Sequence, residues 1–76
     1  MQRAIVLVSL APGTEEATLA SFKGMKEVTE MYQTYGLYDL ILIVEGTDEQ
    51  AIKSTITGRL RSNPNITSTI TMKVVG

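Results

Sequence analysis

Two stretches of this 76-residue chain are apolar at nearly every position: residues 4–10 (AIVLVSL) and residues 40–44 (LILIV). Side chains alternate between the two faces of a strand, so an unbroken apolar run indicates a strand that is buried on both faces. A chain this short has few elements to cover two faces, because a domain of this size buries only about 60% of its unfolded surface. The two stretches therefore predict a sheet that needs more cover than the chain itself provides.

A first helix is expected directly after the first of these strands. The Pro-Gly pair at 12–13 stops the strand. Thr14 is then suited to cap a helix, and Glu15 and Glu16 fall in its first turn, where the helix dipole favours negative charge. We expect this helix to reach about residue 25.

A hairpin is expected to follow the first helix. Residues 28–35 (VTEMYQTY) alternate between apolar and polar side chains and predict its first strand. Residues 38–45 contain the second apolar run and predict the returning strand. Gly36 and Leu37 then form the turn between them.

A second helix is predicted by a Thr-x-x-Gln capping box at residues 47–50. Its buried side is marked by an apolar stripe with i, i+4 and i+8 spacing: Ile52, Ile56 and Leu60. The Ser-Asn-Pro-Asn run at 62–65 ends this helix. The last strand, residues 66–75, alternates strictly, and we expect one of its faces to carry Ile66, Ser68, Ile70, Met72 and Val74.

The predicted order of elements is βαββαβ, without a linker or repeat. Two right-handed crossovers place both helices on one face of a four-stranded antiparallel sheet. We therefore predict one α+β domain over residues 1–76 with a ferredoxin-like fold. Its helix-free face would still be apolar, so we expect it to pack against a second copy as a dimeric α/β sandwich or barrel.

The composition excludes several kinds of catalytic and metal site. The chain has no cysteine and no histidine, so it lacks thiolate ligands, imidazole ligands and the commonest general base. Its serines accordingly have no histidine with which to form an acyl-transfer triad. We expect no catalytic residue, no metal and no cofactor, and thus a protein that is not an enzyme.

Charge and hydropathy exclude two kinds of partner. The net charge is −1 and the pI about 5.2, whereas nucleic-acid binders carry a basic face. The longest apolar runs are far shorter than a membrane span, and no leader-like segment precedes the first strand. We expect a cytoplasmic protein with no direct contact to nucleic acid or membrane.

Polar and aromatic residues gather at the start of the most apolar strand. Gly36 and Asp39 each have an ordinary structural use, in a positive-φ turn and in bonding turn amides. Together they also suit a free amino acid, because Asp39 can accept from its ammonium and amides around Gly36 can donate to its carboxylate. The predicted site consists of Tyr35, Gly36, Leu37, Tyr38 and Asp39, with the hydroxyls of Thr69 and Thr71 on the last strand.

Two motifs of the chain resemble a known family. The run Gly36-x-Tyr38-Asp39 is similar to the Gly-x-Tyr-Asp hairpin in the effector-binding (RAM) domain of Lrp/AsnC transcription regulators. Residues 64–71 (PNITSTIT) resemble that family's Pro-Gly-Val-x-x-Thr-x-Thr stretch, with Asn65 in place of the usual glycine. Tyr35 also stands where a smaller residue is common.

The resemblance covers essentially the whole chain and implies a stand-alone effector domain without the family's DNA-binding helix-turn-helix. It implies dimers that assemble further, commonly into octamers, with amino-acid effectors bound between dimers near the hairpin. It also implies that the domain modulates transcription through its own assembly or through full-length Lrp/AsnC regulators as partners.

Two other classes share this architecture. A small dimeric α/β-barrel enzyme, such as a cofactor-independent monooxygenase, relies on polar groups inside the barrel, often including the histidine that this chain lacks. An ACT-like regulatory domain also binds amino acids, but near its first strand–helix turn, here residues 11–13. Mapping the ligand would therefore distinguish an ACT-like domain from an Lrp/AsnC-like one.

Overall fold

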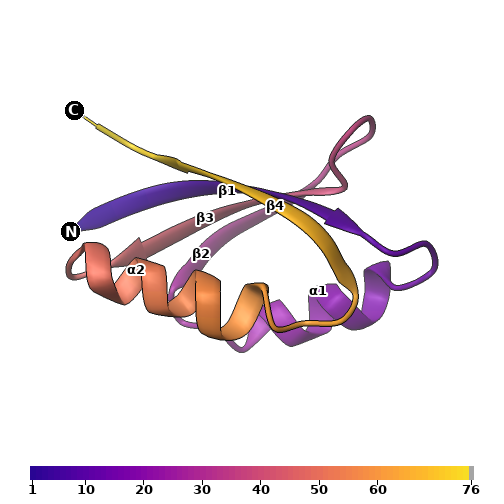
Figure 1. The fold of residues 1–76 in the computed structure, drawn as a ribbon, viewed down its shortest axis with the longest axis horizontal. Helices are drawn as coiled ribbons and strands as arrows, with labels where there is room; N and C mark the ends of the chain where they lie inside the picture. Colours follow the sequence, from indigo (N-terminus) through magenta and orange to yellow (C-terminus); the bar gives the residue numbers. More distant parts are fainter. Residues whose placement is uncertain (76) are drawn as a thin grey trace.

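The computed structural model, which describes residues 1–75, has two layers: a twisted sheet and a pair of helices beneath it (Figure 1). The sheet has the order β2-β3-β1-β4, and each neighbouring pair of strands is antiparallel. The predicted βαββαβ fold is thus confirmed. Its elements are β1 (Gln2–Leu10), α1 (Glu15–Lys23), β2 (Val28–Gln33), β3 (Leu40–Gly46), α2 (Glu49–Thr55), the π-helical turn η1 (Ile56–Leu60) and β4 (Ile66–Lys73).

The core lies between the sheet and the helices. Alternate residues of the central strands β1 and β3 are buried here, and the helices contribute Phe22, Ile52, Ile56 and Leu60. Each large apolar side chain in such a position stabilises the fold by about 1.5–3 kcal/mol relative to exposure. The strand residues of the core are Ala4, Val6, Val8, Leu10, Leu40, Leu42 and Val44.

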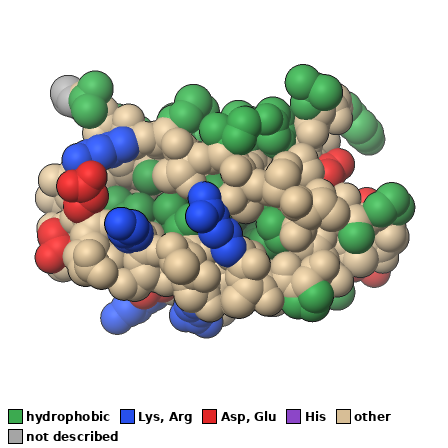
Figure 2. Space-filling view, viewed as in Figure 1, with side chains coloured by type: hydrophobic (Ala, Val, Ile, Leu, Met, Phe, Trp, Pro, Cys, Tyr) green, Lys and Arg blue, Asp and Glu red, His purple; other side chains and the backbone are tan. Residues whose placement is uncertain are grey.

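The opposite face of the sheet has no helix over it. Ile5 of β1 pairs with Ile43 of β3, and both side chains are only half-buried. Ile70 and Met72 of β4 are close to half-exposed on the same face. Hydrophobic side chains accordingly gather along the sheet side of the molecule (Figure 2). The chain thus leaves one apolar sheet face uncovered, as its sequence predicts.

Charged residues border this apolar face at the end of the sheet where β1 begins. The Arg3 guanidinium lies 3.4 Å from the Glu45 carboxylate and 3.8 Å from that of Glu30. Tyr32 donates its phenolic hydrogen to Glu30. This hydrogen bond, together with the negative charge of Glu30, raises the pKa of Tyr32 above its ordinary value of 10.0.

Both helix starts differ from the predicted capping. The Thr14 hydroxyl donates to the carbonyl of Ala11 at 2.6 Å, so it closes the preceding turn and makes no cap to α1. Helix α2 is capped by Asp48, whose Oδ1 accepts from the amide of Ala51 at 2.9 Å, and Thr47 precedes the cap. An extended backbone at Asp48 places its carboxylate over the first turn, so the predicted capping box was wrong by one residue.

The last strand also departs from strict alternation. Its register against β1 shifts between Ser9 and Leu10, which places Ile66 opposite Leu10. A bulge of this kind shifts the strand by one residue, so the side chain beyond it changes face. Ile66 consequently packs against the core, whereas Ile70 and Met72 face the open side. The prediction that all three share one face was wrong.

The second helix widens in its last turn. The amide of Arg61 donates to the carbonyl of Ile56 at 2.9 Å, a bond that spans five residues and defines the π-helical turn η1. Within residues 1–75, neither helix has the length and hydropathy to cross a membrane.

Candidate functional site

The hairpin between β2 and β3 extends beyond the end of the sheet (Figure 1). At its tip the side chains of Tyr35 and Leu37 are fully exposed, at 105% and 89%. Gly36 between them has φ +119°, a conformation that residues with a Cβ rarely adopt. At the base of the hairpin, the Thr34 hydroxyl donates to the Tyr38 carbonyl at 2.8 Å. The hydrogen-bonded base of the hairpin therefore holds the large side chains of Tyr35 and Leu37 exposed to solvent.

Asp39 has a structural contact that the sequence did not reveal. Its Oδ2 accepts from the backbone amide of Leu10 at 2.7 Å, and its own amide donates to the carbonyl of Val8 at 2.8 Å. The carboxylate thus provides a hydrogen-bond acceptor for the Leu10 amide at the end of β1, where the bulge interrupts the regular ladder. Its other oxygen, Oδ1, has no hydrogen-bond partner within residues 1–75 and is free to accept from a ligand.

A hollow of ≈ 390 Å³ lies beside the hairpin. Two carboxylates line it, and no lysine or arginine does, so its electrostatic potential favours a cationic group. One carboxylate belongs to the predicted Asp39 and the other to Glu15, which the first turn of α1 brings next to the hairpin. The sequence places Glu15 only at the helix start and gives no sign of Gln33 and Thr34, which also line the hollow with Tyr35.

The hairpin also offers unpaired hydrogen-bond donors. The backbone N–H groups of residues 35–38 have no protein acceptor within residues 1–75, whereas the amides of Thr34 and Asp39 on either side are bonded. A Cβ at Gly36 would meet nothing within 4 Å, so the backbone there is open to a ligand. These donors are of the kind that an α-carboxylate requires.

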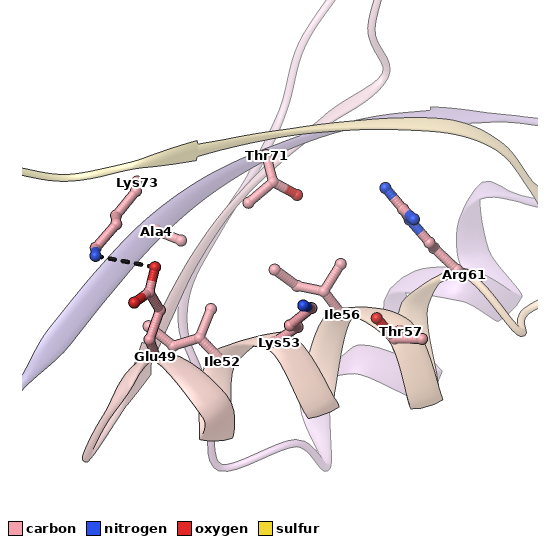
Figure 3. Close-up of a pocket in the computed structure, with 9 residues that line it drawn as sticks. All are labelled: Ala4, Glu49, Ile52, Lys53, Ile56, Thr57, Arg61, Thr71 and Lys73. Atoms are coloured by element: carbon pink, nitrogen blue, oxygen red, sulfur yellow. Dashed lines mark ion pairs between the residues drawn. The ribbon is translucent and has the colours of Figure 1, made fainter.

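Thr69 and Thr71 do not meet the hairpin within one chain. Thr69 pairs with Val8, whose other neighbour is Leu40 at the base of the hairpin, so β1 separates the threonine from that strand. Both threonines belong to β4, an edge strand, while the hairpin joins β3 to the opposite edge strand, β2. The hydroxyl of Thr71 instead faces a different pocket, between β4 and α2 (Figure 3).

The chain matches one known protein family. The family described as the Lrp/AsnC ligand binding domain matches residues 3–75, which is nearly the whole sequence. The chain belongs to this family. The resemblance of the hairpin and of residues 64–71 to the Lrp/AsnC effector domain is thereby confirmed. Among curated proteins, none matches the sequence of this chain.

Solved structures have the same fold. FFRP-DM1 is 36% identical with a TM-score of 0.95, over 99% of this chain and 100% of its own. A hypothetical protein of Pyrococcus horikoshii is 36% identical with a TM-score of 0.92, over 100% of this chain and 92% of its own. A transcriptional regulator of Neisseria meningitidis, solved with L-methionine, is 22% identical with a TM-score of 0.91, over 99% of this chain and 50% of its own. The fold of this chain thus spans all or nearly all of two other chains and half of a longer one.

Proposed function

We propose that this Lrp/AsnC domain binds a free amino acid in the hollow beside the β2–β3 hairpin. The observation that carries the proposal is the pairing of opposite polarities: carboxylates line the hollow, and unpaired amide donors follow along residues 35–38. An amino acid has an ammonium and a carboxylate on one carbon, so it needs both within a few ångströms. The Neisseria meningitidis regulator, which shares the fold, is seen with L-methionine.

Each group of the ligand has an assigned partner in this proposal. The ammonium is bound by Oδ1 of Asp39 and by the carboxylate of Glu15, through charge-assisted hydrogen bonds. The α-carboxylate accepts from the amides around Gly36 and Tyr38. Tyr35 supplies the apolar wall for the ligand side chain, because it lines the hollow.

Assembly completes the site in the same proposal. The open sheet face, with Ile5, Ile43, Ile70 and Met72, packs against a second copy and forms a sheet-on-sheet dimer. Dimers then join further, up to an octamer, so that the hairpin of one dimer meets another chain. Thr69 enters the ligand site only from such a neighbour, because within one chain it lies toward the other edge of the sheet, whereas the Thr71 hydroxyl faces the pocket between β4 and α2.

The domain acts on transcription through protein contacts in this proposal. Ligand binding at the hairpin stabilises one assembly over another, and full-length Lrp/AsnC regulators with the same fold are the natural partners for mixed assemblies. The regulatory effect follows from a difference in ligand affinity between assembly states, which is what shifts such an equilibrium.

Isothermal titration calorimetry with the common L-amino acids tests the proposal. We expect Asp39→Asn to weaken binding by roughly 1–3 kcal/mol, since it removes the charge but keeps an oxygen acceptor for the Leu10 amide. Glu15→Gln should weaken binding as well. Glu16→Gln is the matched control, because Glu16 shares the first turn of α1 but does not line the hollow.

The proposal would be wrong if no common amino acid released or absorbed heat with the wild-type domain. It would also be wrong if Asp39→Asn bound the amino acid as tightly as wild type, because Asp39 would then be only the residue that holds the end of β1.

A further inference from the structure

A second pocket lies between the edge strand β4 and helix α2, toward the other edge of the sheet from the hairpin hollow. It has a volume of ≈ 330 Å³ and is lined by residues of β1, β4, α2, η1 and the turn after η1 (Figure 3). It shares no lining residue with the hairpin hollow. It is therefore a separate site with its own chemistry.

The floor of this pocket is apolar. Ile52 and Ile56 point from the helix toward the sheet, and Ala4 of β1 lies opposite them (Figure 3). Ala4 is the smallest of the four buried β1 side chains, the others being valines and a leucine. Its single methyl group leaves space under β4 that a larger side chain would fill. The floor thus suits an apolar group of a ligand.

The rim of the pocket is basic. It has three cations, Lys53, Arg61 and Lys73, and a single carboxylate, Glu49, so its net charge is +2. Glu49 is already engaged, since its Oε1 lies 3.0 Å from Nζ of Lys73. Within residues 1–75, neither Lys53 nor Arg61 has a carboxylate within ion-pair distance. Basic side chains surround hydrophobic atoms on this side of the molecule (Figure 2).

Two rim groups are directed at the same space. Arg61 extends from the end of η1 toward β4, and the Thr71 hydroxyl points from β4 into the pocket (Figure 3). A guanidinium offers a planar fork of N–H donors that matches a carboxylate, and a hydroxyl adds one more donor. An anion above the apolar floor would have both groups within its reach.

We propose that this pocket binds a small organic acid that has an apolar body and no ammonium group. The carboxylate is held by Arg61, with Lys53 and Thr71 beside it, and the apolar body lies on Ile52 and Ile56. An amino acid is disfavoured here because its ammonium would meet a net positive rim whose one carboxylate is already paired. The two pockets thus differ in sign: the hairpin hollow carries two carboxylates and this one carries a net charge of +2.

Binding at this pocket would be additional to the function proposed for the hairpin hollow. A deaminated carboxylate is the chemical class that lacks the ammonium of an amino acid but keeps its acid and its apolar body. The domain would then respond separately to an amino acid at one pocket and to an acid without nitrogen at the other.

The test uses three probes of matched shape with the wild-type domain: 4-methylpentanoate, L-leucine and 3-methylbutylamine. Amide chemical shifts in ¹⁵N-resolved NMR spectra report where each one binds. We expect 4-methylpentanoate to shift the amides of Ile52, Ile56 and Thr71 in a saturable way. L-Leucine should bind at this pocket at least about tenfold more weakly, and the amine should not bind there, because the cationic rim of Lys53, Arg61 and Lys73 repels an ammonium group.

Two arginine variants supply the matched comparison. Arg61→Gln should weaken 4-methylpentanoate binding by at least about tenfold, because it removes a charge-assisted hydrogen bond. Arg59→Gln removes the same charge two residues earlier in the chain, but Arg59 does not line the pocket. The affinity of this variant for 4-methylpentanoate should therefore equal that of wild type. Asp39→Asn should also leave this affinity unchanged, which separates the result from the fate of the hairpin site.

Three results would overturn the inference. The first is a wild-type spectrum in which 4-methylpentanoate shifts no pocket amide or shifts only the hairpin. The second is an L-leucine affinity at the pocket equal to that of 4-methylpentanoate. The third is an equal affinity of the Arg61→Gln and Arg59→Gln variants for 4-methylpentanoate.

Discussion

Aspartate substitutions at Val8 and Ile43 should have different consequences, one for folding and one for association, although both residues belong to central strands. Val8 faces the helices and is 0% exposed. Ile43 faces the open side of the sheet and is only half-buried. We predict that Val8→Asp prevents folding, whereas Ile43→Asp leaves the chain folded and abolishes the proposed sheet-on-sheet dimer.

The expected cost of Val8→Asp compares with the whole stability of the domain. A buried carboxylate without a partner costs about 3–5 kcal/mol. The lost burial of the valine adds about 1.5–3 kcal/mol. At 0.05–0.15 kcal/mol per residue, a chain of this length has a total stability of about 4–11 kcal/mol. The two costs together are therefore of the same size as the free energy that favours folding.

The cost of Ile43→Asp falls on association. In a single chain the new carboxylate reaches water, so the free energy of unfolding falls by only about 1 kcal/mol. In a sheet-on-sheet dimer two such carboxylates become buried, one from each copy, which weakens association by about 6–10 kcal/mol. A change of this size raises the dissociation constant by roughly ten-thousand-fold or more.

Sedimentation velocity measures the mass in solution, and circular dichroism measures the fold. Ala20→Asp is the control. Ala20 is exposed on α1, so this substitution introduces the same charge away from the open sheet face. A wild-type chain that sediments as a monomer at high micromolar concentration would refute the assembly argument. If Ile43→Asp lost its secondary structure as completely as Val8→Asp, the placement of Ile43 outside the folded core would be wrong.

Three further predictions concern single contacts. Asp48→Ala should lower the free energy of unfolding by about 1 kcal/mol, measured by urea denaturation, because it removes the acceptor of the Ala51 amide that caps α2. Gly58→Ala should raise it by about 0.4–1 kcal/mol, because Gly58 has no positive φ and a Cβ there meets nothing within 4 Å; a fall would contradict this. Glu30→Gln should lower the pKa of Tyr32 toward 10.0, followed by NMR of the phenol ring, since the raised pKa comes from the hydrogen bond and charge of Glu30. Below pH 10 that contact stabilises the fold, and its contribution should be lost as the pH rises through the raised pKa of Tyr32.

The sequence by itself determined the order of elements, the sheet and its uncovered face. Apolar runs at residues 4–10 and 40–44 require burial on both faces of their strands, and this requirement does not depend on the other elements of the chain. Gly36 in a positive-φ turn was also predictable, because the conformational preference of glycine is local. The two motifs around the hairpin and at residues 64–71 were sufficient to indicate the family.

Tertiary structure alone decided which residues that are far apart in the sequence contact one another. Asp39 bonds the amide of Leu10, 29 residues away, and Glu15 approaches the hairpin only because α1 packs under the sheet. The bulge between Ser9 and Leu10 returned Ile66 to the core, which strict alternation could not anticipate. Contacts of this kind depend on register and packing across the sheet, and these follow from the free energy of the whole fold, since a shift of one residue exchanges the faces of a strand.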